Sequence, residues 1–173
     1  MQLRTLPVIL LISILFFSCK KNDIITNSNA GTNGNNTTNI VYNVNKADML
    51  QLINNVRAKG CTCGTTVMPP VAALVWNDQL AKAAYDHTAD MYTNNYFSHT
   101  GLDGSDPGQR ITAAGYSWNS YGENIANGYA TEQSVMNAWL NSEGHCKNIM
   151  NSGFKDIGAG RDGNYWTQDF GSK

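Results

Sequence analysis

The feature that most constrains this chain is the spacing of three cysteines. Cys61 and Cys63 lie close together, and Cys146 follows more than 80 residues later. A disulfide from Cys146 to Cys61 or to Cys63 would close a long loop and, in the chain-entropy model, stabilise the fold by about 4 kcal/mol. Because the number is odd, this set cannot pair completely. A Cys61–Cys63 bond and free thiols are the alternatives.

Residues 1–18 have the pattern of an export signal. One Arg precedes an apolar run from Leu6 to Phe17, and a small residue comes just before Cys19. The run is shorter than the roughly 20 residues that a membrane-spanning helix needs. The pattern predicts a lipoprotein signal with Cys19 as the lipidated residue, and plain cleavage is the alternative. We therefore expect an exported chain, in which disulfides are common.

Residues 19–45 form a segment rich in asparagine. Nine of the 26 residues from Lys20 to Asn45 are Asn, and only one is aromatic. This composition buries too little apolar surface to offset the entropy of ordering, so we expect a flexible tether. Residues 46–173 follow, and their number suits one compact domain.

Periodicity and capping residues predict helices around a small sheet. Apolar residues at helical spacing from Met49 to Val56 predict a helix over 46–58, and Asn77 opens a second helix. An Asp-Pro pair predicts a short helix that Gly115 ends. Further expected elements are helices over 131–141 and from Ser142, strands over 116–129 and on both sides of the turn signal Asp162-Gly163, and a loop over 61–76. This pattern predicts an α+β domain.

Three polar residues from separate elements are candidates for one site. His99 lies in a loop between two expected helices, Glu123 lies at the edge of a strand, and His145 precedes Cys146 in a helical turn. Two imidazoles and a carboxylate can form the first shell of Zn²⁺ or a similar ion. Neighbours on a helix point about 100° apart, so His145 is not placed to activate Cys146 as a nucleophile.

Several other chemistries lack their motifs. The chain has no HExxH, phosphate loop, GxSxG or zinc-finger pairing, and it offers only Glu123 as a credible acid for a glycosidase. Lys and Arg number 12 and Asp and Glu 13, without a basic stripe, so nothing predicts nucleic-acid binding.

His87 lies on an apolar helix stripe and is expected in the core. Arg110 and Asp103 are expected to order the loop around His99.

Four stretches of the sequence match the motifs of a known family in their order and spacing. They are YFSHTGLDGSDPGQRITAAGY, GENIANG, VMNAWLNSEGHCKNIMNSGFKDIGAG and YWTQDFG. Together they resemble the bacterial branch of the CAP superfamily (SCP-like domains) from about Lys46 to Gly171. The resemblance implies an α-β-α sandwich, in which helices flank a small, mainly antiparallel three-stranded sheet beside an open cleft. The His of the family's F-S-H motif is His99, and the Glu of its G-E-N motif is Glu123.

The resemblance is incomplete at the cleft. In eukaryotic members the cleft presents two His and two acidic residues, and some members bind a divalent metal there. The histidine of their G-H-Y-T-Q strand is replaced here by Tyr165, which we expect to line the cleft. His145 matches the histidine of the Ser- and Gly-His-containing turn of bacterial members, and Ser142 stands where a second acid is expected. If a divalent metal such as zinc is bound, the resemblance implies His99 and His145 as its ligands.

The resemblance and the export signal together imply a binding role. We expect a monomer, anchored through Cys19 on the periplasmic face or the surface of the bacterial envelope, whose cleft binds a small hydrophobic molecule or a cell-wall component. The ligand would be a lipid, a sterol-like molecule or a cell-wall fragment. A metal-dependent hydrolase that uses His99, His145 and Glu123 is one alternative, and a structural or adhesive surface module is another. A shared fold does not establish a reaction, so catalysis is left open.

Overall fold

The structure is a computed structural model that describes residues 40–173. The expected signal, the lipidation site Cys19 and most of the expected tether lie outside the described residues. The elements are β1 (Ile40–Val41), β2 (Val44–Asn45), α1 (Lys46–Lys59), β3 (Cys61–Cys63), β4 (Thr66–Met68), β5 (Val75–Trp76), α2 (Asp78–Thr93), α3 (Pro107–Ala113), β6 (Ser120–Asn127), α4 (Glu132–Asn141), α5 (Glu143–Ile149), β7 (Asp156–Asp162) and β8 (Tyr165–Ser172). Within this part of the chain, no helix has the length and apolar character needed to cross a membrane.

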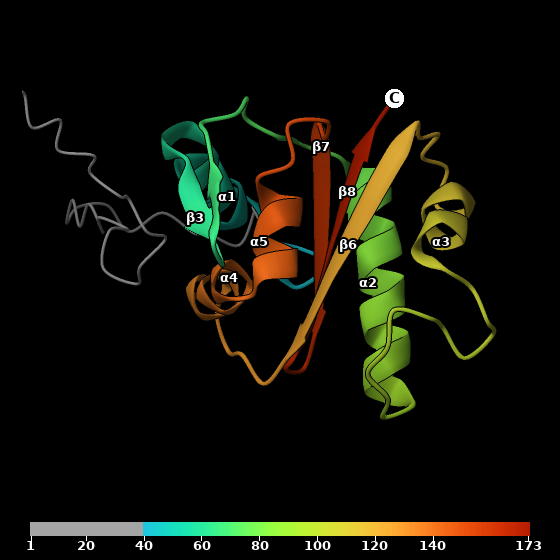
Figure 1. The fold of residues 1–173 in the computed structure, drawn as a ribbon. Helices are drawn as coiled ribbons and strands as arrows, with labels where there is room; N and C mark the ends of the chain where they lie inside the picture. The colour runs from blue at the N-terminus through green and yellow to red at the C-terminus, as the bar shows by residue number, and fades with distance from the viewer. Residues whose placement is uncertain (1–39) are drawn as a thin grey trace, which may run out of the picture.

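The main sheet forms the middle of three layers, as Figure 1 shows. Helices α1, α4 and α5 cover one face, while α2 and α3 cover the other. The strand order is β5-β7-β8-β6, so β6 is an edge strand. This arrangement confirms the predicted α-β-α sandwich.

The sheet has four strands rather than the expected three. The additional strand β5 pairs in parallel with β7, and the other pairs are antiparallel. It lies in the segment expected to be a loop, which also contains the β3–β4 hairpin. Asp162 pairs with Tyr165, so the turn between β7 and β8 is Gly163-Asn164, one residue later than the turn signal indicated.

Capping residues explain where the helices begin. The side chains of Asn45 and Asn77 accept hydrogen bonds from the first backbone N–H groups of α1 and α2. Asp106 forms a capping box with Gln109 at the start of α3. These three helix starts were predicted. Ser142 precedes α5 without a side-chain capping bond.

Two glycines of β7 bring α2 close to the sheet. A Cβ on Gly158 would lie 1.9 Å from the backbone nitrogen of Ala81, and one on Gly160 would lie 2.3 Å from Cα of Tyr85. The helix backbone therefore lies directly on the strand. The opposite face of β7 carries Ile157 and Ala159, which belong to the core under the other helices.

Alternation along β8 divides its side chains between the two layers. Trp166 and Phe170 enter the core on the α1 side. Thr167 lies on the α2 side, where its hydroxyl accepts a hydrogen bond from Thr88 at 2.7 Å. Asp169 has the same strand parity as Thr167, so it too faces the α2 layer.

The ordered domain includes residues expected in the tether. Strands β1 and β2 pair with each other, and Val44 is fully buried. Tyr42 stacks on Tyr85 at 5.2 Å between ring centroids, and its carbonyl accepts a hydrogen bond from the backbone N–H of Arg161. The folded domain therefore extends at least to Ile40 rather than beginning at residue 46, because these apolar side chains find a place on the core.

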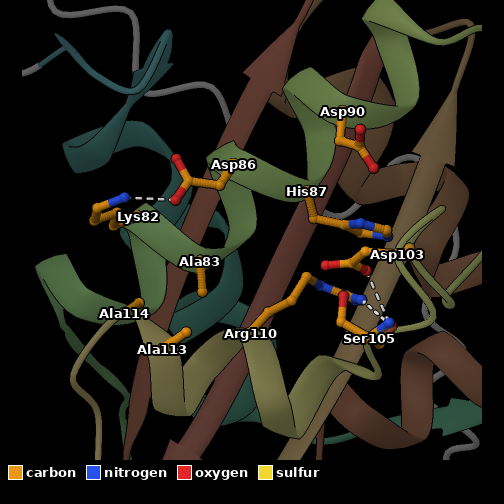
Figure 2. A pocket seen from close by; sticks show the side chains of 11 residues that line it. Lys82, Ala83, Asp86, His87, Asp90, Asp103, Ser105, Arg110, Ala113 and Ala114 are labelled. Atoms are coloured by element: carbon orange, nitrogen blue, oxygen red, sulfur yellow. Dashed lines mark hydrogen bonds and ion pairs between the residues drawn. The ribbon is translucent and has the colours of Figure 1, made fainter.

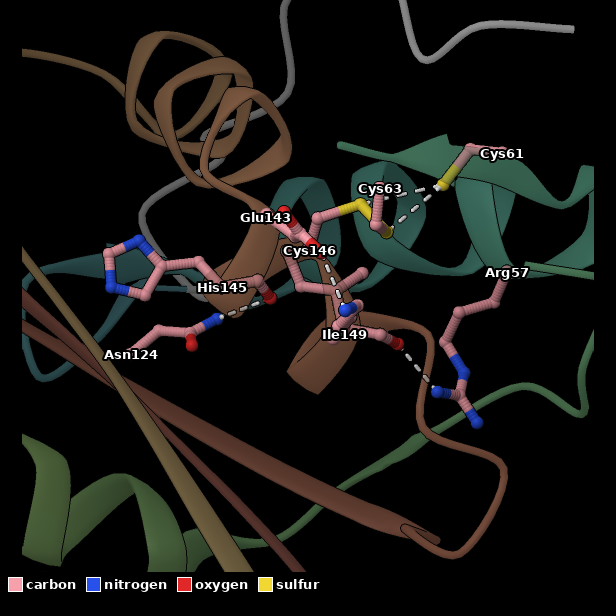
Figure 3. The surroundings of a disulfide bond; sticks show 9 residues. Arg57, Cys61, Cys63, Asn124, Glu143, His145, Cys146 and Ile149 are labelled. Carbon is pink, nitrogen blue, oxygen red and sulfur yellow. Dashed lines mark hydrogen bonds and ion pairs between the residues drawn. A yellow bond between two sulfur atoms is a disulfide. The ribbon is translucent and has the colours of Figure 1, made fainter. Parts of the chain in front are cut away.

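A disulfide joins Cys63 in β3 to Cys146 in α5 (Figure 3). The two residues are 83 positions apart, and their Cα atoms lie 5.5 Å apart. The structure thus confirms the expected long-range link and gives Cys63 as the partner. Cys61 Sγ lies 3.7 Å from the sulfur of Cys146 and 3.9 Å from that of Cys63.

Candidate functional site

Glu123 is the buried centre of the candidate site. Its side chain on β6 is only 2% exposed. Oε1 accepts a hydrogen bond from Nδ1 of His99 at 2.6 Å, and Oε2 accepts one from Nη2 of Arg110 at 2.7 Å. The structure therefore brings two predicted site residues, His99 and Glu123, into direct contact.

The Glu123 contact fixes the orientation of the His99 ring. Because Nδ1 points to the carboxylate, Nε2 is the ring nitrogen left for another partner. The His99 side chain is 52% exposed, so this edge of the ring is accessible to solvent. A carboxylate that orients an imidazole in this way is common behind histidines that bind ligands or metals.

Arg110 connects the site to the loop that carries His99. Its Nη1 donates to the carbonyl of Ser105 at 2.9 Å, and its Nη2 also donates to the carbonyl of His99 at 3.0 Å. Asp103 accepts a hydrogen bond from the backbone N–H of Ser105. The Ser105 side chain and then this backbone bond lower the pKa of the Asp103 carboxyl. Both side chains order the loop, as expected.

His145 reaches the site from the opposite layer. It lies on α5, and its carbonyl accepts a hydrogen bond from Asn124, the neighbour of Glu123 on the edge strand β6. In Figure 3 its ring points away from the disulfide of Cys146. Burial lowers the pKa of His145, and the nearby His99 lowers it further, which favours a neutral ring. The two histidines thus come from the two helical layers and lie near each other at the free edge of the sheet.

Tyr165 lies in an aromatic cluster at the start of β8. Its ring centroid lies 6.0 Å from that of Tyr92 on α2 and 6.3 Å from that of Phe97 in the loop before His99. Tyr92 and Phe97 are 51% and 52% exposed. The cluster therefore offers accessible aromatic surface on the loop that presents His99.

Asp169 is an acidic residue that the sequence analysis missed. It is paired directly with Glu123 in the β6–β8 register, and it is 1% exposed. Burial raises the pKa of Asp169 well above its usual value, and the charge of Glu123 adds to the shift. Neither Asp169 oxygen has a well-formed hydrogen bond among the described residues. The alternation of side chains along β8 could have indicated this acid, because it places Asp169 on the face opposite Trp166 and Phe170.

His87 occupies the core position that was predicted for it. The residue is 1% exposed, and its Nε2 lies 2.9 Å from the carbonyl oxygen of Ser98. The bond connects α2 to the residue before His99. His87 thus supports the loop of the site from beneath.

The described residues fit a metal only in part. His99 and His145 supply two imidazoles, but Glu123 is already engaged by His99 and Arg110. Among residues 40–173, three possible metal-ligand side chains lie within 4.8 Å of one another only at Cys61, Cys63 and Cys146. The histidine site therefore lacks a third preformed protein ligand within the described chain.

Comparisons with known proteins agree with the fold. A family model described as "CAP: Cysteine-rich secretory protein family" matches residues 50–170. The uncharacterized membrane protein YlbC of Bacillus subtilis is 33% identical over 130 residues, which are 75% of this chain and 35% of YlbC. The uncharacterized protein YkwD of the same organism is 42% identical over 96 residues, 54% of this chain and 37% of YkwD. The chain thus spans about a third of the length of these relatives.

Two solved bacterial structures have the same architecture. One is an extracellular protein containing an SCP domain from Bacillus anthracis, with 29% identity and a TM-score of 0.68 over 83% of this chain and 45% of the other. The second is an outer surface protein of Borrelia burgdorferi, with 26% identity and a TM-score of 0.58 over 73% of this chain and 88% of the other. A structure named NaASP2 with Zn²⁺, at 16% identity and a TM-score of 0.51 over 73% of this chain and 78% of the other, is similar in fold alone.

Proposed function

Since this chain belongs to the cysteine-rich secretory protein (CAP) family, we propose that it is an exported binding domain whose ligand contacts His99 and His145. The observation that carries the proposal is the buried Glu123 carboxylate, which holds the half-exposed His99 ring in one orientation. A group fixed before the ligand arrives loses little entropy on binding. The arrangement therefore suits recognition of a polar group on the ligand.

The ligand in this proposal is a lipid, a sterol-like molecule or a cell-wall component. The imidazoles of His99 and His145 bind its polar part, and the ring of Tyr165 with its neighbours Tyr92 and Phe97 contacts its apolar part. The exposure of Tyr92 and Phe97 supports this division, because large exposed aromatic side chains often mark interaction sites.

The proposed location is the bacterial envelope. The names of the two bacterial structures, an extracellular protein and an outer surface protein, support export. Anchoring through a lipid on Cys19, at the periplasmic face or the cell surface, belongs to the proposal, as does a monomeric state.

A divalent metal such as zinc is a second candidate for the same two imidazoles. The neutral ring favoured for His145 and the oriented ring of His99 support it, because metals bind the unprotonated nitrogen. Water or the bound molecule would have to complete the coordination. When bound, such an ion would act as a Lewis acid.

Catalysis is less well supported by the geometry. A metal-dependent hydrolase would use Glu123 as a general base or ligand, but both its oxygens already accept hydrogen bonds and its side chain is 2% exposed. Its carboxylate therefore has poor access to an attacking water. We propose that Glu123 orients His99 instead.

Binding assays on the full-length protein test this proposal. Wild type, His99→Ala, His145→Ala and the exposed control Lys59→Ala are compared for cosedimentation with purified peptidoglycan and with phosphatidylglycerol vesicles. We expect one of the two materials to bind wild type and Lys59→Ala equally, and both histidine variants at least about tenfold more weakly. Equal binding by all four proteins would instead favour a structural or adhesive module.

Calorimetric titration with Zn²⁺ tests the metal separately. Stoichiometric binding to wild type that is lost in both histidine variants would assign the ion to this site. Binding that survives both substitutions would place it elsewhere.

A further inference from the structure

Three cysteines meet where strand β3 packs against α5. Cys61 and Cys63 are two positions apart on β3, and side chains at that spacing project from the same face of a strand. Cys146 approaches them from α5 (Figure 3). All three residues are buried, with 5% exposure or less. The strand and the helix therefore bring three sulfur atoms together in the core.

The distances between these sulfurs suit a metal ion. Cys61 Sγ lies 3.7 Å from the sulfur of Cys146 and 3.9 Å from that of Cys63. Zinc binds a thiolate at about 2.3 Å, so two sulfurs of a tetrahedral zinc site lie about 3.8 Å apart. Two of the three sulfur pairs thus already have the spacing that zinc needs. The third pair is the Cys63–Cys146 bond, which has to open first.

No other set of side chains in residues 40–173 offers this arrangement. The cavity between α2 and α3 (Figure 2) has a volume of about 390 Å³, and His87, Asp90 and Asp103 line it. Another of its acids, Asp86, is paired with Lys82. These groups do not come within 4.8 Å of one another in threes, whereas the cysteine sulfurs do. Thiolates are also ligands that favour zinc over the harder cations.

The site requires the reduced chain. None of the three cysteines is a free thiol in the oxidised chain. A low-molecular-weight thiol opens a disulfide by exchange: the two cysteines take up two hydrogens, and two reductant thiols leave joined as a disulfide. The same reductant opens any bond that Cys61 makes. Zn²⁺ then replaces the three thiol protons, which pass to solvent, and forms three zinc–sulfur bonds.

The fourth position of such an ion falls to water. The ring of His145, the neighbour of Cys146, points away from the sulfurs in Figure 3. Zinc sites with three protein ligands commonly keep a water molecule in the remaining position.

We propose that the reduced chain binds one Zn²⁺ ion through Cys61, Cys63 and Cys146, and that formation of the disulfide expels it. The inference goes beyond the proposed function, because it assigns a metal to a cluster that includes neither His99 nor His145.

A cobalt titration of the full-length protein tests the inference. The protein is reduced with dithiothreitol, separated from it without oxygen and titrated with Co²⁺, whose bonds to thiolate absorb in the near ultraviolet. We expect this absorption to saturate at one ion per chain, to vanish when Zn²⁺ displaces Co²⁺, and not to develop in the oxidised protein.

Two cysteine variants show which sulfurs bind the ion. Cys61→Ala keeps the Cys63–Cys146 bond, so it can fold before reduction, and after reduction it should bind Zn²⁺ at least about a hundredfold more weakly than wild type. Cys19→Ala leaves the cluster intact and should bind as wild type does. Absence of the thiolate absorption after reduction, or equal Zn²⁺ affinity of Cys61→Ala and wild type, would overturn the inference.

Urea denaturation of the reduced protein shows whether the ion binds the folded chain. Zn²⁺ should raise the midpoint of wild type, His99→Ala and His145→Ala, but not that of Cys61→Ala. An ion that binds without raising the wild-type midpoint is held by the unfolded chain, and the inference is then wrong. If the histidine variants lose the effect of Zn²⁺ and Cys61→Ala keeps it, the ion belongs to the proposed histidine site instead.

Discussion

At the scale of single residues, Arg110 has the most connected side chain of the site. It pairs with the buried Glu123 and binds two carbonyls of the loop that carries His99 and Ser105. A lysine could not reproduce these bonds, because its ammonium is a point charge and lacks the planar fork of a guanidinium. Loss of Arg110 therefore affects both the charge balance of the site and the position of the loop.

We predict that Arg110→Ala lowers the free energy of unfolding by about 3 kcal/mol, because it leaves the Glu123 charge buried without its cation. Urea denaturation measures the change. Lys82→Ala is the control, since it removes an exposed ion pair with Asp86 and should cost less than about 0.5 kcal/mol. A similar small loss for both variants would show that the Arg110 pair behaves like a surface pair.

Asp169 leads to a prediction on pH. Burial and the neighbouring Glu123 raise the pKa of Asp169, so the folded chain keeps this proton to a higher pH than the unfolded chain, in which an Asp ionises above about pH 4. The folded state then binds more protons, and the stability that Asp169 contributes falls as pH rises above that value. Asn is neutral at every pH, so Asp169→Asn should gain stability relative to wild type between about pH 4 and pH 8. Denaturation curves across this range measure the difference, and parallel curves would contradict it.

At the scale of elements, the packing of α2 on β7 depends on glycine. A methyl group on Gly158 would lie 1.9 Å from the Ala81 nitrogen, which is backbone and cannot rotate away. Gly144 on α5 is a matched comparison, because an added Cβ there meets no atom within 4 Å.

We predict that Gly158→Ala lowers the free energy of unfolding by at least about 3 kcal/mol through overpacking. Gly144→Ala should instead leave stability unchanged or raise it by up to about 1 kcal/mol, because Ala favours a helix. Thermal unfolding compares the two variants. A Gly158→Ala protein as stable as wild type would mean that α2 can move off the sheet at little cost.

The elements also show what the sequence could predict. The starts of α1, α2 and α3 were correct, because Asn45, Asn77 and Asp106 are capping residues whose effect is local. Strand β5 was missed because its two residues are a strand only through pairing with β7, 81 positions away. The order found from Ile40 to Asn45 was missed for a similar reason, since it depends on contacts with residues such as Tyr85 and Arg161.

The candidate site, like the fold, could be predicted only in part from the sequence. The family motifs led to His99, Glu123 and His145, and the structure gives the contact of the first two. The Asp169 partner depends on the register between β6 and β8, which no local pattern specifies. The roles of His99, His145 and Tyr165 in binding stay predictions.

At the scale of the whole molecule, one covalent bond connects distant parts of the chain. The Cys63–Cys146 disulfide joins the β3–β4 hairpin to α5 across 83 positions. We predict that the double variant Cys63→Ala/Cys146→Ala loses about 4 kcal/mol of stability. Urea denaturation with and without reductant measures it: reductant should destabilise wild type and leave the double variant much less affected. Equal sensitivity of both proteins would assign the reductant's effect to another bond.

Because of this disulfide, the two histidines of the site are held in place by different kinds of bond. His145 sits next to a residue held by a covalent bond, whereas His99 is positioned by hydrogen bonds: its ring bonds to Glu123, and its backbone carbonyl accepts from Arg110. Acid weakens the contacts that hold His99, whereas thiol reductants break the disulfide beside His145. The half of the site on α5 is therefore covalently secured only once an oxidant has formed the Cys63–Cys146 bond.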